Sequence, residues 1–191
     1  MTSPFDGDAA RWAARAPHVP DAWFRRRSHL HGPVHTQRVH IHTQRLLREI
    51  GWHEDDARLA LSAALWHDIG RIDDGVEPIH GARGAARADQ LGLTADLSAS
   101  EAMDVRFAIC RHSLPDSGAA ELAHRLAVDP DEVRRLTDPE RALRVLWLLK
   151  DADALDRIRL GFGECADPRQ LRHAAAVALV PFAAELFTVL Y

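Results

Sequence analysis

The sequence predicts a single all-α domain of about eight to ten helices. Apolar residues recur at helical spacing through nearly the whole chain, and no convincing run of alternating β-branched residues interrupts them. A chain of 191 residues is long enough for one domain with a substantial core, and its 47% hydrophobic and 27% charged residues are typical of a globular protein.

Local signals place the individual helices. Pro33 suits the first turn of a long helix that Gly51 would end, and the segment after Gly51 begins with acidic residues that stabilise a helix N-terminus. Asp138-Pro139 and Asp167-Pro168 are further start signals. Such signals predict helices over residues 9–16, 19–27, 33–50, 53–68, about 78–91, about 98–112, shorter stretches within 119–136, about 138–161, and 167–191 with a break near Pro181.

Composition and charge exclude several classes of protein. The net charge of -4 provides no field that attracts nucleic acid, so a small molecule is the more natural partner. Cys110 and Cys165 have no short-range pairing, which suits a reducing compartment rather than a disulfide scaffold. The N-terminus has no signal-peptide pattern, and the mostly apolar stretch 174–191 contains Pro181 and Glu185. We therefore expect a cytoplasmic protein without a membrane span, whose alanine-rich C-terminal helix packs on the domain or forms a homodimer contact.

Histidines and aspartates occur in an order that suggests a metal site. The set consists of His35, the doublet His67-Asp68, His80, His112 and an acidic helix with Asp151 and Asp153. Such groups on otherwise apolar helices are costly to bury unless a metal ion pairs with them. Imidazole and carboxylate together suit Mn, Fe, Zn, Ni or Co, and carboxylate also tolerates Mg. The chain is therefore predicted to be a metalloenzyme.

The helical positions of these residues support a shared cavity. His35 lies on an apolar helix face, and His67 and His112 each end an apolar stripe on their own helices. Asp151 and Asp153 both lie on apolar faces of one helix, so periodicity does not choose between them.

The segments around these residues resemble the HD superfamily of metal-dependent phosphohydrolases, which is named after its His-Asp doublet. The similar segments are HTQRV at 35–39, ALWHDIGR at 64–71, HGARGAARA at 80–88, ICRHS at 109–113 and LLKDADALD at 148–156. They follow the family's order at family-like spacings. The resemblance implies a single HD-type metal-binding domain over residues 30–160, an N-terminal helical extension over 1–29, and C-terminal helices over 161–191 that pack on the same domain.

The resemblance also implies a set of metal ligands. These are His35, His67, Asp68, His80, His112 and Asp153. Asp153 is favoured over Asp151 because the family's Lys-x-Ala-Asp and Ala-Asp-x-x-Asp patterns both place the ligand there. Subgroups that retain the two middle histidines often bind two ions bridged by the aspartate of the doublet, and in others those histidines face the substrate phosphate. One or two divalent ions are expected, with Mn, Fe, Mg, Co or Ni as candidates.

The expected activity is hydrolysis of a phosphoester or phosphoanhydride bond in a small phosphorylated molecule, with nucleotides as the commonest class in the family. The candidate catalytic residues are Asp68, His80 and His112. Three basic residues near the predicted site are candidates for binding phosphate: Arg38, Arg71 and Lys150. Two alternatives stay open on the same scaffold, namely a mixed-valent di-iron oxygenase and a non-enzymatic ligand-binding domain.

Overall fold

The computed structural model describes residues 8–77, 79–114, 136–160 and 167–191 of the chain. These residues form eight α-helices and three 3₁₀ helices, and no strand occurs among them. The prediction of an all-α domain is therefore confirmed. The helices predicted within 119–136 lie outside the described residues.

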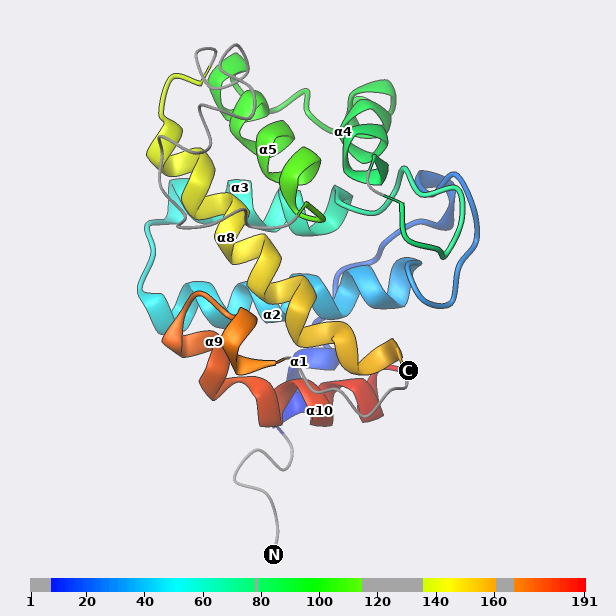
Figure 1. Ribbon diagram of the computed structural model, residues 1–191, viewed down its shortest axis with the longest axis vertical. Coiled ribbons are helices and arrows are strands. Elements are labelled where there is room, and N and C mark those ends of the chain that lie inside the picture. Colours follow the sequence, from blue (N-terminus) through cyan, green and yellow to red (C-terminus); the bar gives the residue numbers. More distant parts are fainter. Residues whose placement is uncertain (1–7, 78, 115–135, 161–166) are drawn as a thin grey trace, which may run out of the picture.

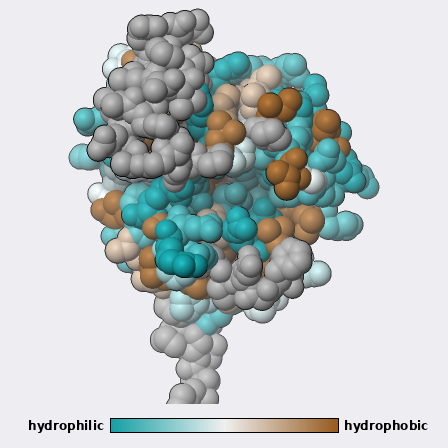
Figure 2. Space-filling model, in the orientation of Figure 1, coloured by the Kyte–Doolittle hydropathy of each residue, from teal (hydrophilic) through white to brown (hydrophobic). Residues whose placement is uncertain are grey.

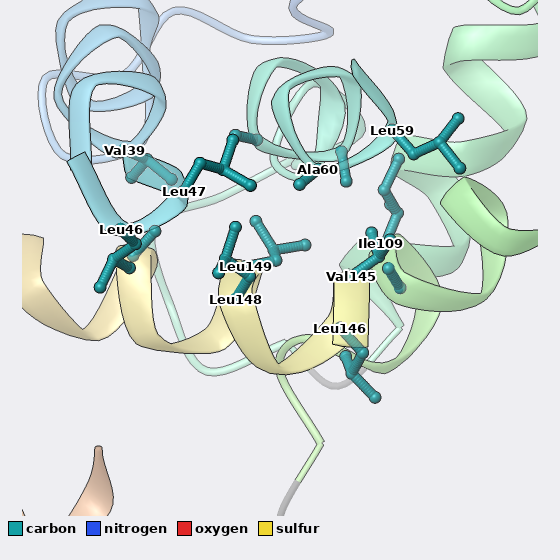
Figure 3. Close-up of a cluster of buried hydrophobic side chains, with 14 of the residues drawn as sticks. Val39, Leu46, Leu47, Leu59, Ala60, Ile109, Val145, Leu146, Leu148 and Leu149 are labelled. Carbon is teal, nitrogen blue, oxygen red and sulfur yellow. The ribbon is translucent and has the colours of Figure 1, made fainter. Parts of the chain in front are cut away.

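Four long helices enclose the core. They are α2 (Pro33–Ile50), α3 (Glu54–Trp66), α5 (Ala99–Arg111) and α8 (Pro139–Leu155). α8 crosses α2 and α3, and α5 packs against both α3 and α8 (Figure 1). Figure 3 shows the buried aliphatic side chains between them, which include Val39, Leu46, Leu47, Leu59, Ala60, Ile109, Val145, Leu146, Leu148 and Leu149. Burying one large aliphatic side chain stabilises a fold by about 1.5–3 kcal/mol, so this cluster holds the helix crossings in place.

The ends of the first two long helices determine where the doublet lies. Pro33 occupies the first turn of α2, and Gly51 adopts a left-handed conformation (φ 72°) from which its N–H donates to the Leu47 carbonyl. Both features match the sequence-based prediction. α3 ends at Trp66 rather than at residue 68, so the His67-Asp68 doublet lies in the turn that follows the helix.

Close backbone contacts position α4 (His80–Gln90) at the doublet. A Cβ atom at Gly84 would meet the carbonyl oxygens of Trp66 and His67, and a Cβ atom at Gly81 would meet the carbonyl of Ile109 in α5. Because main-chain atoms cannot move aside, only glycine allows this approach. These two contacts place the N-terminus of α4 between the ends of α3 and α5.

The helix predicted over 19–27 is wrong. The structure has only one 3₁₀ turn there, η1 (Asp21–Trp23). The guanidinium of Arg87 donates to the carbonyls of Ala22 and Trp23, which a helix would use internally, and the N–H of Arg25 donates to the carbonyl of Ile69. Tertiary hydrogen bonds therefore replace the helical ones in this segment.

The C-terminal part differs from the prediction in detail. α8 is followed by the 3₁₀ helix η2 (Asp156–Leu160), and the region after 167 forms η3 (Pro168–Gln170), α9 (Ala174–Ala178) and α10 (Val180–Val189). The predicted break at Pro181 is the first turn of α10, where a proline is tolerated because no helical N–H is needed. α10 packs against η2 and against α1 (Asp8–Ala13), which brings the N-terminal helix onto the same domain (Figure 1).

On the face of the molecule drawn in Figure 2, hydrophobic residues lie among hydrophilic ones. Among the described residues, no helix combines the length and the apolar character that crossing a membrane requires.

Candidate metal centre

Two pairs of histidines meet where four helices begin or end. His35 lies in the first turn of α2 and His67 follows α3, and their Nε2 atoms are 3.1 Å apart. His80 begins α4 and His112 follows α5, with their Nε2 atoms 3.0 Å apart. All four rings are buried. The helix ends that carry them lie on one side of the molecule (Figure 1).

Asp68 lies between the two pairs and turns one carboxylate oxygen toward each. Its Oδ2 is 3.5 Å from Nε2 of His35 and 3.6 Å from Nε2 of His67. Its Oδ1 is 3.4 Å from Nε2 of His80 and 3.7 Å from Nε2 of His112. Two clusters of donor atoms therefore share a single buried carboxylate.

The other nitrogen of each ring is held by an acceptor within the protein. Nδ1 of His35 donates to Oδ2 of Asp156 at 2.7 Å. The remaining three rings donate from Nδ1 to main-chain carbonyls of the preceding turn, which are those of Ala64 for His67, Glu77 for His80 and Ile109 for His112. This arrangement selects the tautomer whose Nε2 carries a lone pair, as in metal-binding histidines.

The electrostatics of the cluster fit a bound cation. Burial lowers the pKa of His67 to about 3 and that of His80 to about 4, so both rings are neutral at pH 7. Burial opposes the ionised form of Asp68, but His67 and the other surrounding histidines outweigh it and hold its pKa well below the ordinary value. Neutral rings with protonated Nδ1 aim their Nε2 lone pairs at one another, and a divalent ion bound among them would relieve that repulsion.

Asp153 and Asp151 point to different parts of the structure. Oδ1 of Asp153 lies 3.4 Å from Nε2 of His35, and this buried oxygen accepts no hydrogen bond from the described residues. Asp151 instead accepts hydrogen bonds from the main-chain N–H groups of Arg172 and His173 and from both of their side chains. Asp153 therefore lies beside the histidines, whereas Asp151 binds the segment before α9.

Several combinations of these side chains could hold a metal ion. In each of them one donor atom per residue lies within 4.8 Å of the others. The combinations are His31 with His35 and Asp68, His35 with His67 and Asp153, and His67 with Asp68 and His112.

Two cluster residues were not selected by the sequence analysis. Nδ1 of buried His31 is 2.9 Å from Oδ2 of Asp68. Arg159 lies in η2, and its Nη2 is 3.6 Å from Oδ1 of Asp153 and 3.5 Å from Nδ1 of His31. His31 precedes the start of α2 in a histidine-rich stretch, which is the only signal in the sequence that could have indicated it.

Arg38 does not line the cavity beside the cluster. Its Nε and Nη2 donate to the two carboxylate oxygens of Asp156 at 2.6 and 3.0 Å, and its Nη1 donates to the carbonyl of Leu190 at 2.7 Å. Burial opposes the ionised form of Asp156, but hydrogen bonds from His35 and Arg38 outweigh it and lower its pKa to about 2. The structure thus uses Arg38 to hold the carboxylate that orients His35, which is a different role from the phosphate contact expected of it.

A cavity of about 1070 Å³ opens beside the cluster and is lined by His31, His80, His112 and Asp153. This volume matches the upper range of small-ligand sites. The other charged residues that line it are Arg71, Asp74, Glu77, Lys150, Arg157, Arg159, Arg169 and Arg172, so basic groups outnumber acidic ones. Of the predicted phosphate ligands, Arg71 and Lys150 are therefore at the cavity, and Lys150 also donates to the carbonyl of Leu114.

The described residues form an all-helical domain with a candidate metal site. Its buried histidines, buried Asp68 and half-buried Asp153 form groups able to hold a metal ion. The family model of the HD domain matches residues 34–158, more than half of the chain. The chain therefore belongs to the HD domain family, whose members are generally metal-dependent phosphohydrolases. No curated protein and no solved structure matches the chain significantly.

Proposed function

We propose that this protein hydrolyses a phosphoester or phosphoanhydride bond in a small phosphorylated molecule, with nucleotides as the first class to test. The observation that carries the proposal is the position of Asp68, whose two oxygens each face a pair of buried histidines. That centre opens onto a cavity with more basic than acidic side chains. A dianionic phosphate is the substrate group that such surroundings attract most strongly.

Two cation positions are proposed around the shared carboxylate. His35, His67, Asp153 and Oδ2 of Asp68 would hold one ion, and His80, His112 and Oδ1 of Asp68 would hold the other. Imidazole with carboxylate suits Mn, Fe, Co or Ni, whereas the four histidines make Mg a weaker match. When bound, such ions lower the pKa of a coordinated water and stabilise the charge that develops on the phosphoryl group.

The side chains of the chain itself bind and orient the substrate. Arg71, in the loop after α3, and Lys150, in α8, both line the cavity and are proposed to hold the phosphoryl oxygens. His31 donates toward the shared carboxylate and keeps it oriented between the histidine pairs. His80 and His112 line the same cavity, so they are also placed to contact the reacting group if only one ion binds.

The test is release of phosphate or pyrophosphate from a panel of nucleotides, phosphomonoesters and cyclic nucleotides. Metal-stripped protein would be assayed with Mn²⁺, Co²⁺, Ni²⁺ or Mg²⁺, with Asp68→Ala as the blank. We expect release that requires the added ion and is lost in the variant by at least about a thousandfold, because both cation positions lose a ligand. Release that persists undiminished in Asp68→Ala would refute the proposal.

The same arrangement favours one second candidate, a di-iron oxygenase, because two histidine pairs on one carboxylate would also hold two iron ions. This candidate predicts iron retained after anaerobic purification, together with substrate-dependent oxygen consumption. No release of phosphate or pyrophosphate across the panel, in protein that retains iron, would favour this candidate. No release in protein that binds no metal would favour a non-enzymatic ligand-binding domain.

A further inference from the structure

Arg71 has an unusual position for a phosphate-binding residue, because its guanidinium already contacts two of the proposed metal ligands. Its Nε donates to Oδ1 of Asp68 at 2.9 Å, and its Nη2 donates to Nε2 of His80 at 3.3 Å. Its Nη1 donates to the carbonyl of Gly75, which anchors the side chain to the loop before α4. The guanidinium therefore lies against the His80–His112 pair.

The atoms that Arg71 contacts are the ones that the second ion needs. Nδ1 of His80 donates to the carbonyl of Glu77, so Nε2 carries the only in-plane lone pair of that ring. One lone pair can accept a hydrogen bond from a guanidinium or bind a metal ion, but it cannot do both. Oδ1 of Asp68 is likewise engaged by a positive charge, which repels a divalent ion at the same place.

Beside the first cation position, Nη2 of Arg159 lies 3.6 Å from Oδ1 of Asp153, an ion pair without a hydrogen bond, so this ligand oxygen stays open to a metal ion. Among the described residues, no arginine or lysine donates a hydrogen bond to the ring of His35 or His67. Oδ2 of Asp68 is contacted by His31 rather than by a permanent cation. The two halves of the centre therefore differ in their readiness to take up an ion. Asp153 adds a second carboxylate oxygen to the first position, whereas Arg71 occupies ligand atoms of the second.

We propose that the Arg71 guanidinium and the second divalent ion compete for Asp68 and His80. This inference rests on the proposed metal centre and assigns its two positions different affinities. The protein then binds one ion tightly at His35 and His67, and a second ion only when Arg71 leaves. Arg71 also lines the cavity, so the displaced guanidinium can pair there with a phosphate oxygen. Uptake of the second ion and phosphate binding consequently favour the same movement of one side chain.

Metal titration tests the competition without any activity assay. Metal-stripped wild-type protein, Arg71→Met and Arg157→Met would each be titrated with Mn²⁺, with bound and spin-coupled ions followed by electron paramagnetic resonance. Arg157→Met is the matched control, because it removes one exposed cavity-lining arginine that is not part of the proposed centre. Circular dichroism would show that each variant keeps its helical content.

We expect Arg71→Met to lower the dissociation constant of the second ion by about tenfold or more, because a charged hydrogen bond no longer opposes it. The first dissociation constant should change by less than about threefold, and Arg157→Met should leave the difference between the two ions unchanged. An equal gain in Arg157→Met would show a general charge effect and overturn the proposal. Equal dissociation constants for the two ions in wild-type protein would also overturn it, as would an unchanged dissociation constant of the second ion in Arg71→Met. Either result would leave the proposed metal centre intact. Wild-type protein that binds no ion would refute the centre itself, and this inference with it.

Discussion

At the scale of single residues, the helix after Asp138 shows what sequence reasoning can and cannot resolve. Asp151 and Asp153 are two residues apart and therefore face directions that differ by about 200° around the helix. Both faces are apolar, so periodicity left them equivalent, and the preference for Asp153 came from family resemblance alone. The structure separates them, because Asp151 binds the segment before α9 and Asp153 approaches His35.

These two aspartates make a matched pair of substitutions. Asp153→Asn should weaken metal binding by at least about tenfold with little loss of stability, because it removes a charged donor from the centre. Asp151→Asn should keep the metal but lower the free energy of unfolding by about 2 kcal/mol, since a neutral amide cannot accept all the hydrogen bonds of Arg172 and His173. Metal content and urea denaturation of both variants measure the contrast. Loss of metal in Asp151→Asn and loss of stability in Asp153→Asn would contradict the roles given to the two residues.

The residues that sequence reasoning missed share a physical cause. His31 and Asp156 act through contacts between segments far apart in the chain, to Asp68 and to His35 respectively. Arg38 was assigned to phosphate because it follows His35 by three residues on one helix face. Its actual partners, Asp156 and the carbonyl of Leu190, come from the other end of the chain and leave no local signal.

At the scale of elements, helix ends carried most of the information in the sequence. The proline at the start of α2, the glycine after it and the Ser98 capping box of α5 are local devices, and those helices lie where they were predicted. The segment 19–27 has a good local start but is overridden by hydrogen bonds from Arg87. The site depends on such ends, since each of the four histidines lies in or next to a terminal turn.

Because α4 approaches the doublet closely, we expect a glycine-to-alanine substitution in this helix to destabilise the protein, although helix propensity alone would make it stabilising. An alanine in place of a helical glycine usually stabilises a helix by about 1 kcal/mol. Gly84→Ala should instead lower the free energy of unfolding by about 1–3 kcal/mol, because the added Cβ meets the carbonyls of Trp66 and His67. It should also weaken metal binding by displacing His67 or His80.

Ala82→Gly is the control on the exposed face of the same helix. It should cost about 1 kcal/mol from propensity alone and leave metal binding unchanged. Chemical denaturation and metal titration of both variants distinguish the two effects. A stabilised Gly84→Ala protein with normal metal affinity would contradict the proposed packing.

At the scale of the whole molecule, the core accommodates histidines that take no part in the centre. His40 and His42 lie on α2, and burial lowers the pKa of each to about 4. Neither ring nitrogen of His42 has a hydrogen-bond partner among the described residues, and its ring packs edge-on against Phe182. His42 lies two helical turns after His35 on α2, but its surroundings are those of a core residue.

The lowered pKa values of His40 and His42 predict how the free energy of unfolding depends on pH. Their pKa values are lower in the folded than in the unfolded protein, so the unfolded chain binds more protons between about pH 4 and 6.5. Their contribution to stability is therefore complete above pH 6.5 and is lost as the pH falls toward 4, by about 3 kcal/mol for each ring.

His42→Leu tests this pH dependence against the wild-type protein. The variant should be more stable than wild type at pH 7 by about 1 kcal/mol, because two buried nitrogens without partners are removed. Its advantage should grow as the pH falls from 6.5 to 4, because the ionisations that both proteins share cancel in the difference. Urea denaturation across that range provides the measurement, and a difference that shrinks toward low pH would contradict the assignment of His42 as a neutral core residue.

The most direct test of the proposed metal centre is to locate the ions themselves. Crystals of the protein grown with Mn²⁺ would be measured at the manganese absorption edge, where anomalous scattering marks the metal alone. We expect a strong peak among His35, His67, Asp153 and Oδ2 of Asp68, and a weaker one beside His80 and His112, from which the Arg71 guanidinium has moved away. Absence of manganese from the surroundings of Asp68, in protein that binds it elsewhere, would contradict the proposed metal centre.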